Sequence, residues 1–125
     1  MERRKRVLVV EDEVLVSEMI CDALIEDGFE VHVSADADDA LRYLSRHSVD
    51  VLFTDIDLPG GMDGGLLARC AREMKPDLPV VYASGKATGL RHVAKVPGSI
   101  FLQKPYDPEQ ACTLMARLST DTDED

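Results

Sequence analysis

The sequence of 125 residues contains no tryptophan, few aromatic residues of any kind and only three cysteines. Cys21, Cys70 and Cys112 lie far apart and form no CxxC pair, which argues against a disulfide framework and against a cysteine-based zinc site. No apolar run approaches the length of a membrane-spanning helix, and the first residues lack the apolar segment of a secretory signal. We therefore expect a cytoplasmic protein with reduced, inert thiols.

Positive charge is also scarce, because 14 Lys and Arg residues face 24 Asp and Glu residues, for a net charge of −10. This balance argues against nucleic acid as a partner. Four of the acids lie in the last seven residues, Ser119 to Asp125, which we interpret as a disordered acidic tail. The length predicts a single domain over residues 1–118. The three histidines, His32, His47 and His92, are scattered along the chain and suggest no function of their own.

Short apolar runs alternate with segments of helical periodicity along the whole chain. One helix is marked by apolar residues at 15, 16, 19, 20, 23 and 24 and is ended by Gly28. Another can be capped by Ser34 or Asp36 and runs to about Arg46. The last is marked by Asp107 as N-cap and Pro108 as its first residue. The expected strands are 7–10, 30–33, 49–54, 80–83 and 99–102; the expected helices are 14–27, 36–46, 64–74, 88–96 and 108–118, of which 88–96 is the least well specified. Strict alternation predicts an α/β fold, a parallel sheet with helices on both faces.

Chemically active side chains follow four of the five expected strands. Glu11 and Asp12 follow the first strand and Asp55 ends the third, with Asp57 two residues on; Ser84 follows the fourth and Lys104 the fifth. Because the carboxyl ends of parallel strands meet at one edge of the sheet, these groups should converge there.

Several carboxylates this close repel one another unless a cation lies between them. Carboxylate and carbonyl oxygens suit Mg²⁺, which would leave Asp55 ionised and nucleophilic towards phosphorus. Lys104 and Ser84 could then each hold a phosphoryl oxygen, since phosphoryl transfer needs mainly positioning and charge stabilisation. The sequence thus predicts a magnesium-dependent phosphoryl site centred on Asp55.

Four motifs, V-L-V-V-E-D-E, L-F-T-D-I-D-L-P-G-G-M-D-G, P-V-V-Y-A-S-G and F-L-Q-K-P-Y, resemble those of receiver domains of two-component response regulators, of the single-domain chemotaxis-regulator type. The resemblance implies a doubly wound, flavodoxin-like (βα)₅ fold with strand order 2-1-3-4-5. It also implies phosphorylation of Asp55 by a histidine kinase or a phosphotransfer protein. The ligands of Mg²⁺ would be Asp12, Asp55 and the backbone carbonyl of Asp57, with Glu11 acting through water. Lys104-Pro105 would be a cis peptide bond.

The resemblance further implies how the signal leaves the domain. Phe101 takes the position of a switch aromatic, and the segment 88–96, the fifth strand and the last helix form the face that reports phosphorylation. We expect a downstream protein to bind there, or the domain to form a phosphorylation-dependent homodimer. No enzymatic activity is expected beyond the domain's own phosphorylation and dephosphorylation. Lys86 and Asp57 should flank the mouth of the site, and we hypothesise that they pair across it and restrict the attacking water.

Alternatives remain open at this point. Asp55-Ile56-Asp57 also fits the Asp-x-Asp motif of haloacid-dehalogenase-type phosphatases, although only one helix follows Lys104 and no further acidic strand end is available for a metal. The chain could equally be an interaction module that is never phosphorylated. As a receiver it could be a stand-alone regulator, a phosphate shuttle or sink, or a part of a hybrid histidine kinase.

Overall fold

Five parallel strands form one sheet in the order β2-β1-β3-β4-β5, which confirms the predicted fold class and strand order. The computed structural model describes residues 4–85 and 95–121, the last two as backbone only. The strands are β1 (Arg6–Val10), β2 (Glu30–Ser34), β3 (Val51–Asp55), β4 (Val80–Ser84) and β5 (Ile100–Gln103). The described helices are α1 (Val14–Glu26), α2 (Ala37–Arg46), α3 (Gly64–Met74) and α4 (Pro108–Asp121). Most of the helix expected over 88–96 lies outside the described residues.

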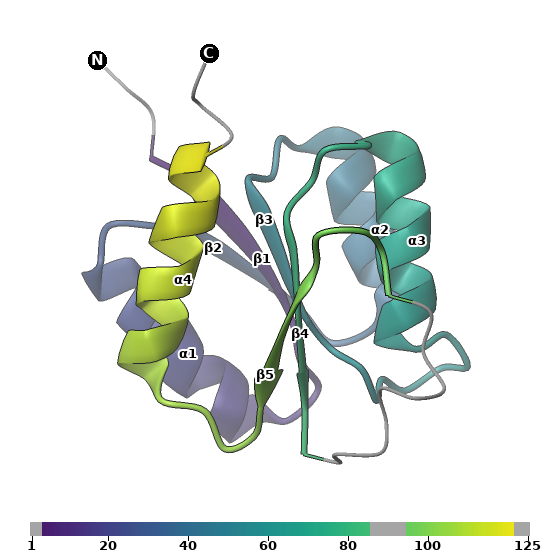
Figure 1. Cartoon of the computed structure of the whole chain (residues 1–125). Coiled ribbons are helices and arrows are strands. Elements are labelled where there is room, and N and C mark those ends of the chain that lie inside the picture. The colour runs from purple at the N-terminus through teal and green to yellow at the C-terminus, as the bar shows by residue number, and fades with distance from the viewer. Residues whose placement is uncertain (1–3, 86–94, 122–125) are drawn as a thin grey trace.

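Helices cover both faces of the sheet, with α1 and α4 on one face and α2 and α3 on the other (Figure 1). Each face therefore has its own core. Val7, Val9, Val51 and Phe53 pack against α1 and α4, whereas Leu8, Val10, Leu52 and Tyr82 belong to the core under α2 and α3. The strands β3 and β4 are buried along their whole length, as near-continuous apolar strands covered on two faces should be. The edge strands β2 and β5 are only partly buried.

Local signals in the sequence explain where most helices begin and end. The Asp36 side chain accepts a hydrogen bond from Asp39 N at 2.8 Å, and the Asp107 side chain accepts one from Glu109 N at 3.0 Å, so both act as the predicted N-caps. Gly28, with a φ of 97°, lets the chain leave α1 in a conformation that other residues disfavour. The capping of α3 by Asp63, which accepts from Leu66 N at 2.8 Å, was not predicted.

The apolar stripe predicted along α1 is only partly correct. Ile20 and Leu24 are fully buried, but Leu15 is 81% exposed and Met19 is 46% exposed. Adjacent residues on a helix point about 100° apart. The sheet therefore covers one residue of each apolar pair more completely than the other, and the pairs nearest the start of α1 leave a side chain in solvent.

Some element boundaries also differ from expectation. The strand β3 ends at Asp55 itself, so this carboxylate belongs to a buried strand and not to the loop after it. The helix α4 continues past Leu118 to Asp121, and Ser119 is buried with its hydroxyl donating to the Ala116 carbonyl at 3.1 Å. The first residues of the expected tail are thus helical, and residues 122–125 lie outside the described part of the chain.

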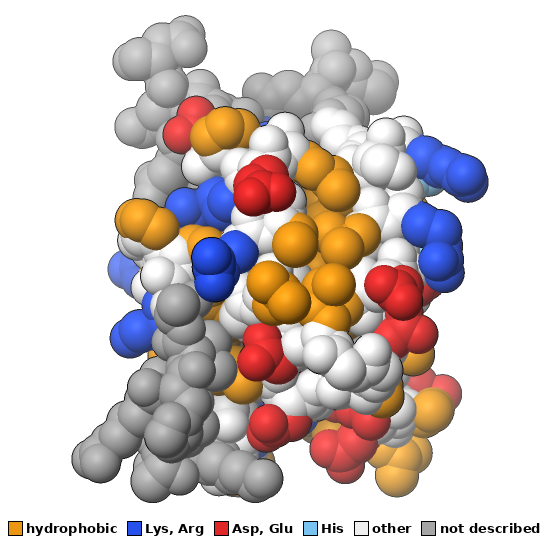
Figure 2. Space-filling view, turned by 90° about the vertical axis from the view of Figure 1, so that its right-hand side faces the viewer, with side chains coloured by type: hydrophobic (Ala, Val, Ile, Leu, Met, Phe, Trp, Pro, Cys, Tyr) orange, Lys and Arg blue, Asp and Glu red, His pale blue; other side chains and the backbone are white. Residues whose placement is uncertain are grey.

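The face in Figure 2 shows hydrophobic side chains at its centre with charged side chains around them, and Lys and Arg side chains stand above Asp and Glu side chains at its right-hand margin. None of the described helices is both long and apolar enough to cross a membrane.

Candidate functional site

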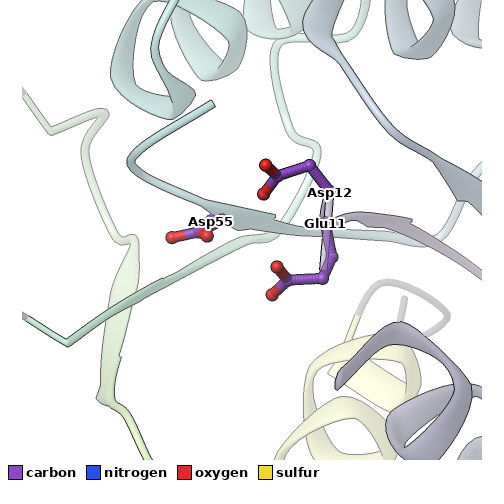
Figure 3. Close-up of side chains that lie close together, drawn as sticks. All are labelled: Glu11, Asp12 and Asp55. Carbon is purple, nitrogen blue, oxygen red and sulfur yellow. The ribbon is translucent and has the colours of Figure 1, made fainter. Parts of the chain in front are cut away.

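Three carboxylates gather at the carboxyl edge of the sheet, where β1 and β3 end. Glu11 and Asp12 follow β1 directly, and Asp55 is the last residue of β3 (Figure 3). Each of the three offers an oxygen, and these oxygens all lie within 4.8 Å of one another. Glu11 and Asp55 are buried, at 5% and 8% exposure, whereas Asp12 is exposed. The cluster therefore opens to solvent on the side of Asp12.

Lys104, which follows β5, reaches the same cluster. Its Nζ lies 2.8 Å from Glu11 Oε1 and 3.1 Å from Asp55 Oδ2. The exposed Glu13 lies at 3.9 Å from the same nitrogen. The Lys104-Pro105 bond is cis, as the resemblance implied. Of the four strand ends that were predicted to converge, those of β1, β3 and β5 are thus brought together by Glu11, Asp12, Asp55 and Lys104.

Burial and neighbouring charges act in opposite directions on Asp55. Burial raises the pKa of the Asp55 carboxyl above its ordinary value, and the nearby Glu11 carboxylate raises it further. The hydrogen bond and the charge of Lys104 lower it again but do not outweigh burial. The protein environment alone therefore does not fully stabilise the ionised, nucleophilic form, and a further cation at this cluster would do so.

The environment of Lys104 keeps it charged. Burial by itself lowers the pKa of the Lys104 ammonium, but its hydrogen bonds to Glu11 and Asp55 outweigh burial, and the net shift is upward. Burial next to Glu11 and Asp55 also raises the pKa of Tyr106 to about 12, so this phenol stays neutral at the edge of the site. The site consequently holds one fixed cation among several carboxylates.

The turn after β3 fixes the backbone of Asp55. Gly64, the first residue of α3, donates its N–H to the Ile56 carbonyl at 2.8 Å and lies directly against the backbone of Asp55. A Cβ atom at position 64 would overlap the Asp55 carbonyl oxygen and would stand 3.0 Å from Ile56 Cα. The Asp57 N–H points to Asp55 Oδ1 at 3.4 Å, a long contact. Close packing against Gly64 thus sets where the Asp55 side chain can point.

The other predicted site residues are placed less directly. Ser84 is fully buried at the end of β4, and its carbonyl accepts the Lys104 N–H at 2.9 Å, which puts it at the same edge as Asp55. Asp57 is exposed beside this edge. Phe101 is half-buried on β5 and pairs in register with Tyr82. Lys86 lies outside the described residues.

Sequence reasoning missed two features of the site. Glu11 was expected to assist Mg²⁺ binding through water, and its direct pair with Lys104 was not predicted. Tyr106 was not singled out, although its position two residues after Lys104 on the same strand-end loop was a usable signal. Both omissions concern contacts across the site, which depend on how strand ends are placed relative to one another.

The donor atoms of the cluster fit a hard divalent cation. Three carboxylates provide only oxygen ligands, and no imidazole or thiol belongs to the group. A metal ion there would reduce the repulsion between Asp12 and Asp55 and would lie next to the nucleophilic oxygen. The acidic cluster can therefore hold a metal ion.

Comparison with known families identifies this arrangement. The family model described as the response regulator receiver domain matches residues 7–116. The chain belongs to this family. The receiver domain is 32% identical over 117 residues to the phosphate regulon transcriptional regulatory protein PhoB of Escherichia coli K12, covering 91% of this chain and 50% of that protein. The chain thus spans about half the length of this curated relative.

Solved structures agree with the assignment. A response regulator receiver protein from Sinorhizobium medicae WSM419 superposes on the receiver domain with a TM-score of 0.86 at 32% identity, covering 94% of this chain and 96% of that one. A CheY-like receiver domain protein from Methanospirillum hungatei JF-1 gives a TM-score of 0.82 at 22% identity, covering 95% and 96%, and supports the fold. The family supports a phospho-accepting response regulator and not a haloacid-dehalogenase-type phosphatase.

Proposed function

We propose that the receiver domain accepts a phosphoryl group on Asp55, with Mg²⁺ bound by Asp12, Asp55 and the Asp57 backbone carbonyl, and with Glu11 assisting. The observation that carries the proposal is the position of Asp55. Its carboxylate lies within 4.8 Å of the Glu11 and Asp12 carboxylates and 3.1 Å from the Lys104 ammonium. A carboxylate that could act as the nucleophile, carboxylates that could bind a metal ion and a fixed cation thus lie close together.

In the proposed step, an Asp55 carboxylate oxygen attacks the phosphorus atom of a phosphohistidine on the donor. A bond forms between that oxygen and phosphorus, the bond between phosphorus and nitrogen breaks, and the imidazole leaves with the electron pair and takes up a proton from water. Lys104 would hold one phosphoryl oxygen and the Ser84 hydroxyl another. Bound Mg²⁺ would neutralise the charge of the incoming group. In dephosphorylation, water would attack the phosphorus atom, the bond between phosphorus and the Asp55 oxygen would break, and phosphate and the free carboxylate would result.

Removal of the metal tests this proposal. With acetyl phosphate and Mg²⁺ the protein should gain about 80 Da, the mass of one phosphoryl unit, and hydroxylamine should remove the gain as it does for acyl phosphates. With EDTA in place of Mg²⁺ the gain should fall at least about a hundredfold in rate, because the repulsion between phosphate and carboxylates is then uncompensated. Intact-mass spectrometry measures both. An equal gain in EDTA would contradict the metal-dependent mechanism.

A patch of apolar side chains next to the site suggests where a protein donor would dock. Val14 is 66% exposed at the start of α1, and Leu15 and Met19 are exposed beside it. A hollow of about 230 Å³ adjoins them, bordered by Val16, Met19, Lys104, Pro105 and Tyr106. We call the exposed residues Val14, Leu15 and Met19 with this hollow the rim patch. Since receiver domains interact with histidine kinases, an apolar surface bordering Lys104 suits docking of the phosphohistidine donor.

Leu15→Asp should slow phosphoryl transfer from a protein donor about thirtyfold, the effect of losing one important apolar contact. It should leave the rate with acetyl phosphate unchanged, because that donor needs no docking surface. The matched control is Ile25→Asp, which changes another exposed apolar residue of α1 at its far end and should affect neither rate. Transfer assays with radiolabelled donor measure the rates. A slower acetyl phosphate reaction in Leu15→Asp would mean that the variant damages the site and not the docking.

The predicted pair of Lys86 and Asp57 concerns the lifetime of the phosphorylated form. If their charges meet across the mouth of the site, they hinder the approach of water to the phosphoryl group. Lys86→Ala should then speed autodephosphorylation about threefold to tenfold, which phosphate release from labelled protein measures. An unchanged rate in Lys86→Ala would remove the hypothesis.

We further propose that the output surface includes β5 and α4. A hollow of about 450 Å³ lies between them, bordered by Phe101, Leu114 and Arg117 among others. A downstream protein, or a second phosphorylated copy of the domain, would bind there, and Phe101 would report the state of Ser84.

A cytoplasmic location is supported by three free cysteines. The uses as regulator, as phosphate shuttle or sink, or within a hybrid kinase are all compatible with this chemistry.

A further inference from the structure

Three aromatic rings that are distant in the sequence form a stack at the β2 edge of the sheet. His32 on β2 stacks on Tyr43 of α2 with ring centroids 3.8 Å apart and planes 10° apart. His47, which caps the end of α2, stacks on the other face of Tyr43 at 4.2 Å. Two of the three histidines, His32 and His47, are therefore brought together, one on each side of a single phenol ring.

Arginines surround this stack. Arg42 and Arg46 lie one turn apart on α2, and together with His32, Asp39, Tyr43 and His47 they border a hollow of about 160 Å³. We call these six residues the edge hollow. Arg42 is held only loosely by Asp39, at 3.6 Å, and its side chain is 66% exposed. Within the described part of the chain, Arg46 has no ion-pair partner. Two guanidinium groups thus have most of their donors available.

The charge of the edge hollow depends on pH. Two guanidinium groups against the Asp39 carboxylate leave one excess positive charge, and protonation of both imidazoles raises the excess to three. The Asp39 carboxylate lies 3.8 Å from His32 Nε2, and His47 stands at the carboxyl end of α2.

Other charged groups of the neighbouring elements also face the stack and contribute to its net charge. The Arg6 guanidinium of β1 lies 6.0 Å from the Tyr43 ring centroid, and it is paired with Glu30 of β2 at 3.0 Å, so these two charges largely cancel near the stack. The hydrogen bond from Ser34, together with His32 and Arg42, holds the pKa of Asp39 below its usual range, so Asp39 stays a carboxylate. Arg42 and Arg46 therefore carry the excess positive charge of the edge hollow, and a bound anion would compensate it.

The geometry decides between a cation and an anion as ligand. The two imidazoles lie on opposite faces of Tyr43, so they cannot coordinate one metal ion together. Guanidinium groups bind oxyanions through paired N–H donors. The volume of about 160 Å³ is small compared with pockets for larger organic ligands but accommodates a tetrahedral oxyanion. Because the chain carries a net charge of −10, most of its surface repels anions, and a local excess of positive charge stands out.

We propose that the edge hollow binds a small oxyanion of the phosphate or sulfate class, held by Arg42 and Arg46, and that the affinity rises as His32 and His47 become protonated. The inference does not depend on phosphorylation of Asp55. The Asp55→Asn variant should bind the oxyanion as the wild type does, so failure of one proposal leaves the other standing.

Sulfate is the most informative probe, because its charge stays fixed between pH 6 and pH 8 whereas imidazole titrates in this range. At constant ionic strength, sulfate should shift the His32 and His47 C2–H signals in proton NMR saturably at pH 6. We expect a dissociation constant in the millimolar range, and about tenfold weaker binding at pH 8, from the loss of two nearby charges screened by water. The His92 signal, assigned through His92→Gln, serves as an internal reference.

Matched double variants distinguish binding at a specific site from nonspecific electrostatic attraction of the anion. Arg42→Gln with Arg46→Gln should abolish saturable binding, whereas Arg69→Gln with Lys95→Gln, which removes one exposed cation from α3 and one from the segment before β5, should preserve it. Because all four side chains are solvent-exposed, both variants should fold. A third experiment compares inorganic phosphate with glucose 6-phosphate. Saturable shifts with both ligands support a hollow that also accepts a phosphate monoester. Saturable shifts with inorganic phosphate alone restrict the ligand to the free ion. Shifts that do not saturate, that are equal at both pH values, or that vanish equally in the two double variants would overturn the proposal.

Discussion

Asp55→Asn should abolish the phosphoryl mass gain that acetyl phosphate and Mg²⁺ produce in the wild-type protein. The amide is isosteric with the carboxylate and can still accept a hydrogen bond from Lys104, so the fold and the cleft should persist. It lacks the anionic oxygen that attacks phosphorus, and among the described residues Glu11 is the only other buried carboxylate of the cluster. Lys104 holds Glu11 more closely than Asp55, at 2.8 Å against 3.1 Å, which makes Glu11 a poor substitute. We expect a loss of at least about a thousandfold in rate, measured by intact-mass spectrometry.

Asp57→Asn is the matched control for this variant. It also removes one negative charge next to the cluster, but the role proposed for Asp57 belongs to its backbone carbonyl, which the substitution keeps. Its phosphorylation rate should stay within about tenfold of the wild-type rate, because removing one solvent-exposed charge has a small energetic effect. A mass gain that persists in Asp55→Asn, or one that disappears equally in Asp57→Asn, would contradict the assignment of Asp55 as the acceptor.

Asp55→Asn should also change how the stability of the protein depends on pH. Because burial raises the pKa of Asp55, the folded state binds this proton more tightly than the unfolded state does, and wild-type stability falls as pH rises through the folded pKa. An asparagine does not titrate. The unfolding free energy of Asp55→Asn relative to wild type should therefore increase from pH 4 to pH 7.5. Urea unfolding in EDTA measures the difference.

Most of the fold was predictable because its signals are local. Apolar runs without alternation marked β3 and β4 as strands buried on both faces, and Asp36, Asp107 and Gly28 marked helix ends through their own backbone or side-chain hydrogen bonds. Strand order followed from the family resemblance and not from periodicity. The exposure of Leu15 was not predictable, because apolar spacing defines a stripe on a helix but not how much of the stripe the sheet covers.

The site was predictable for a different reason. A parallel sheet brings all its carboxyl ends to one edge, so residues that follow strands meet there whatever the distances along the sequence. That rule placed Asp12, Asp55 and Lys104 together. It does not specify which pairs touch, and the direct contact of Glu11 with Lys104 was missed for that reason. The stack of His32, Tyr43 and His47 was missed because no strand-end rule applies to it, and only the packing of α2 on β2 brings the rings together.

Gly64→Ala should destabilise the protein more than any other single-methyl change at the site. The added Cβ would overlap the Asp55 carbonyl oxygen and stand 3.0 Å from both the Asp55 carbonyl carbon and Ile56 Cα. These atoms belong to the backbone of a buried strand end, so they cannot turn aside as a flexible side chain would. The start of α3 must instead move away from β3, which lengthens the hydrogen bond from Gly64 N to Ile56 O. We expect a loss of about 3 kcal/mol or more in unfolding free energy, at the upper end for overpacking.

Gly85→Ala provides the control, because a Cβ at position 85 would have Lys104 Cβ as its nearest neighbour at 3.9 Å, an ordinary contact. Its unfolding free energy should change by less than about 1 kcal/mol. In Gly64→Ala the displaced Asp55 backbone should also misalign the carboxylate, and a misplacement of about 1 Å can slow phosphorylation by acetyl phosphate about a hundredfold. Urea unfolding and the mass assay give the two readouts separately. If Gly64→Ala unfolds at the same urea concentration as Gly85→Ala and is phosphorylated at the wild-type rate, then the packing of α3 against β3 does not position the phosphoacceptor.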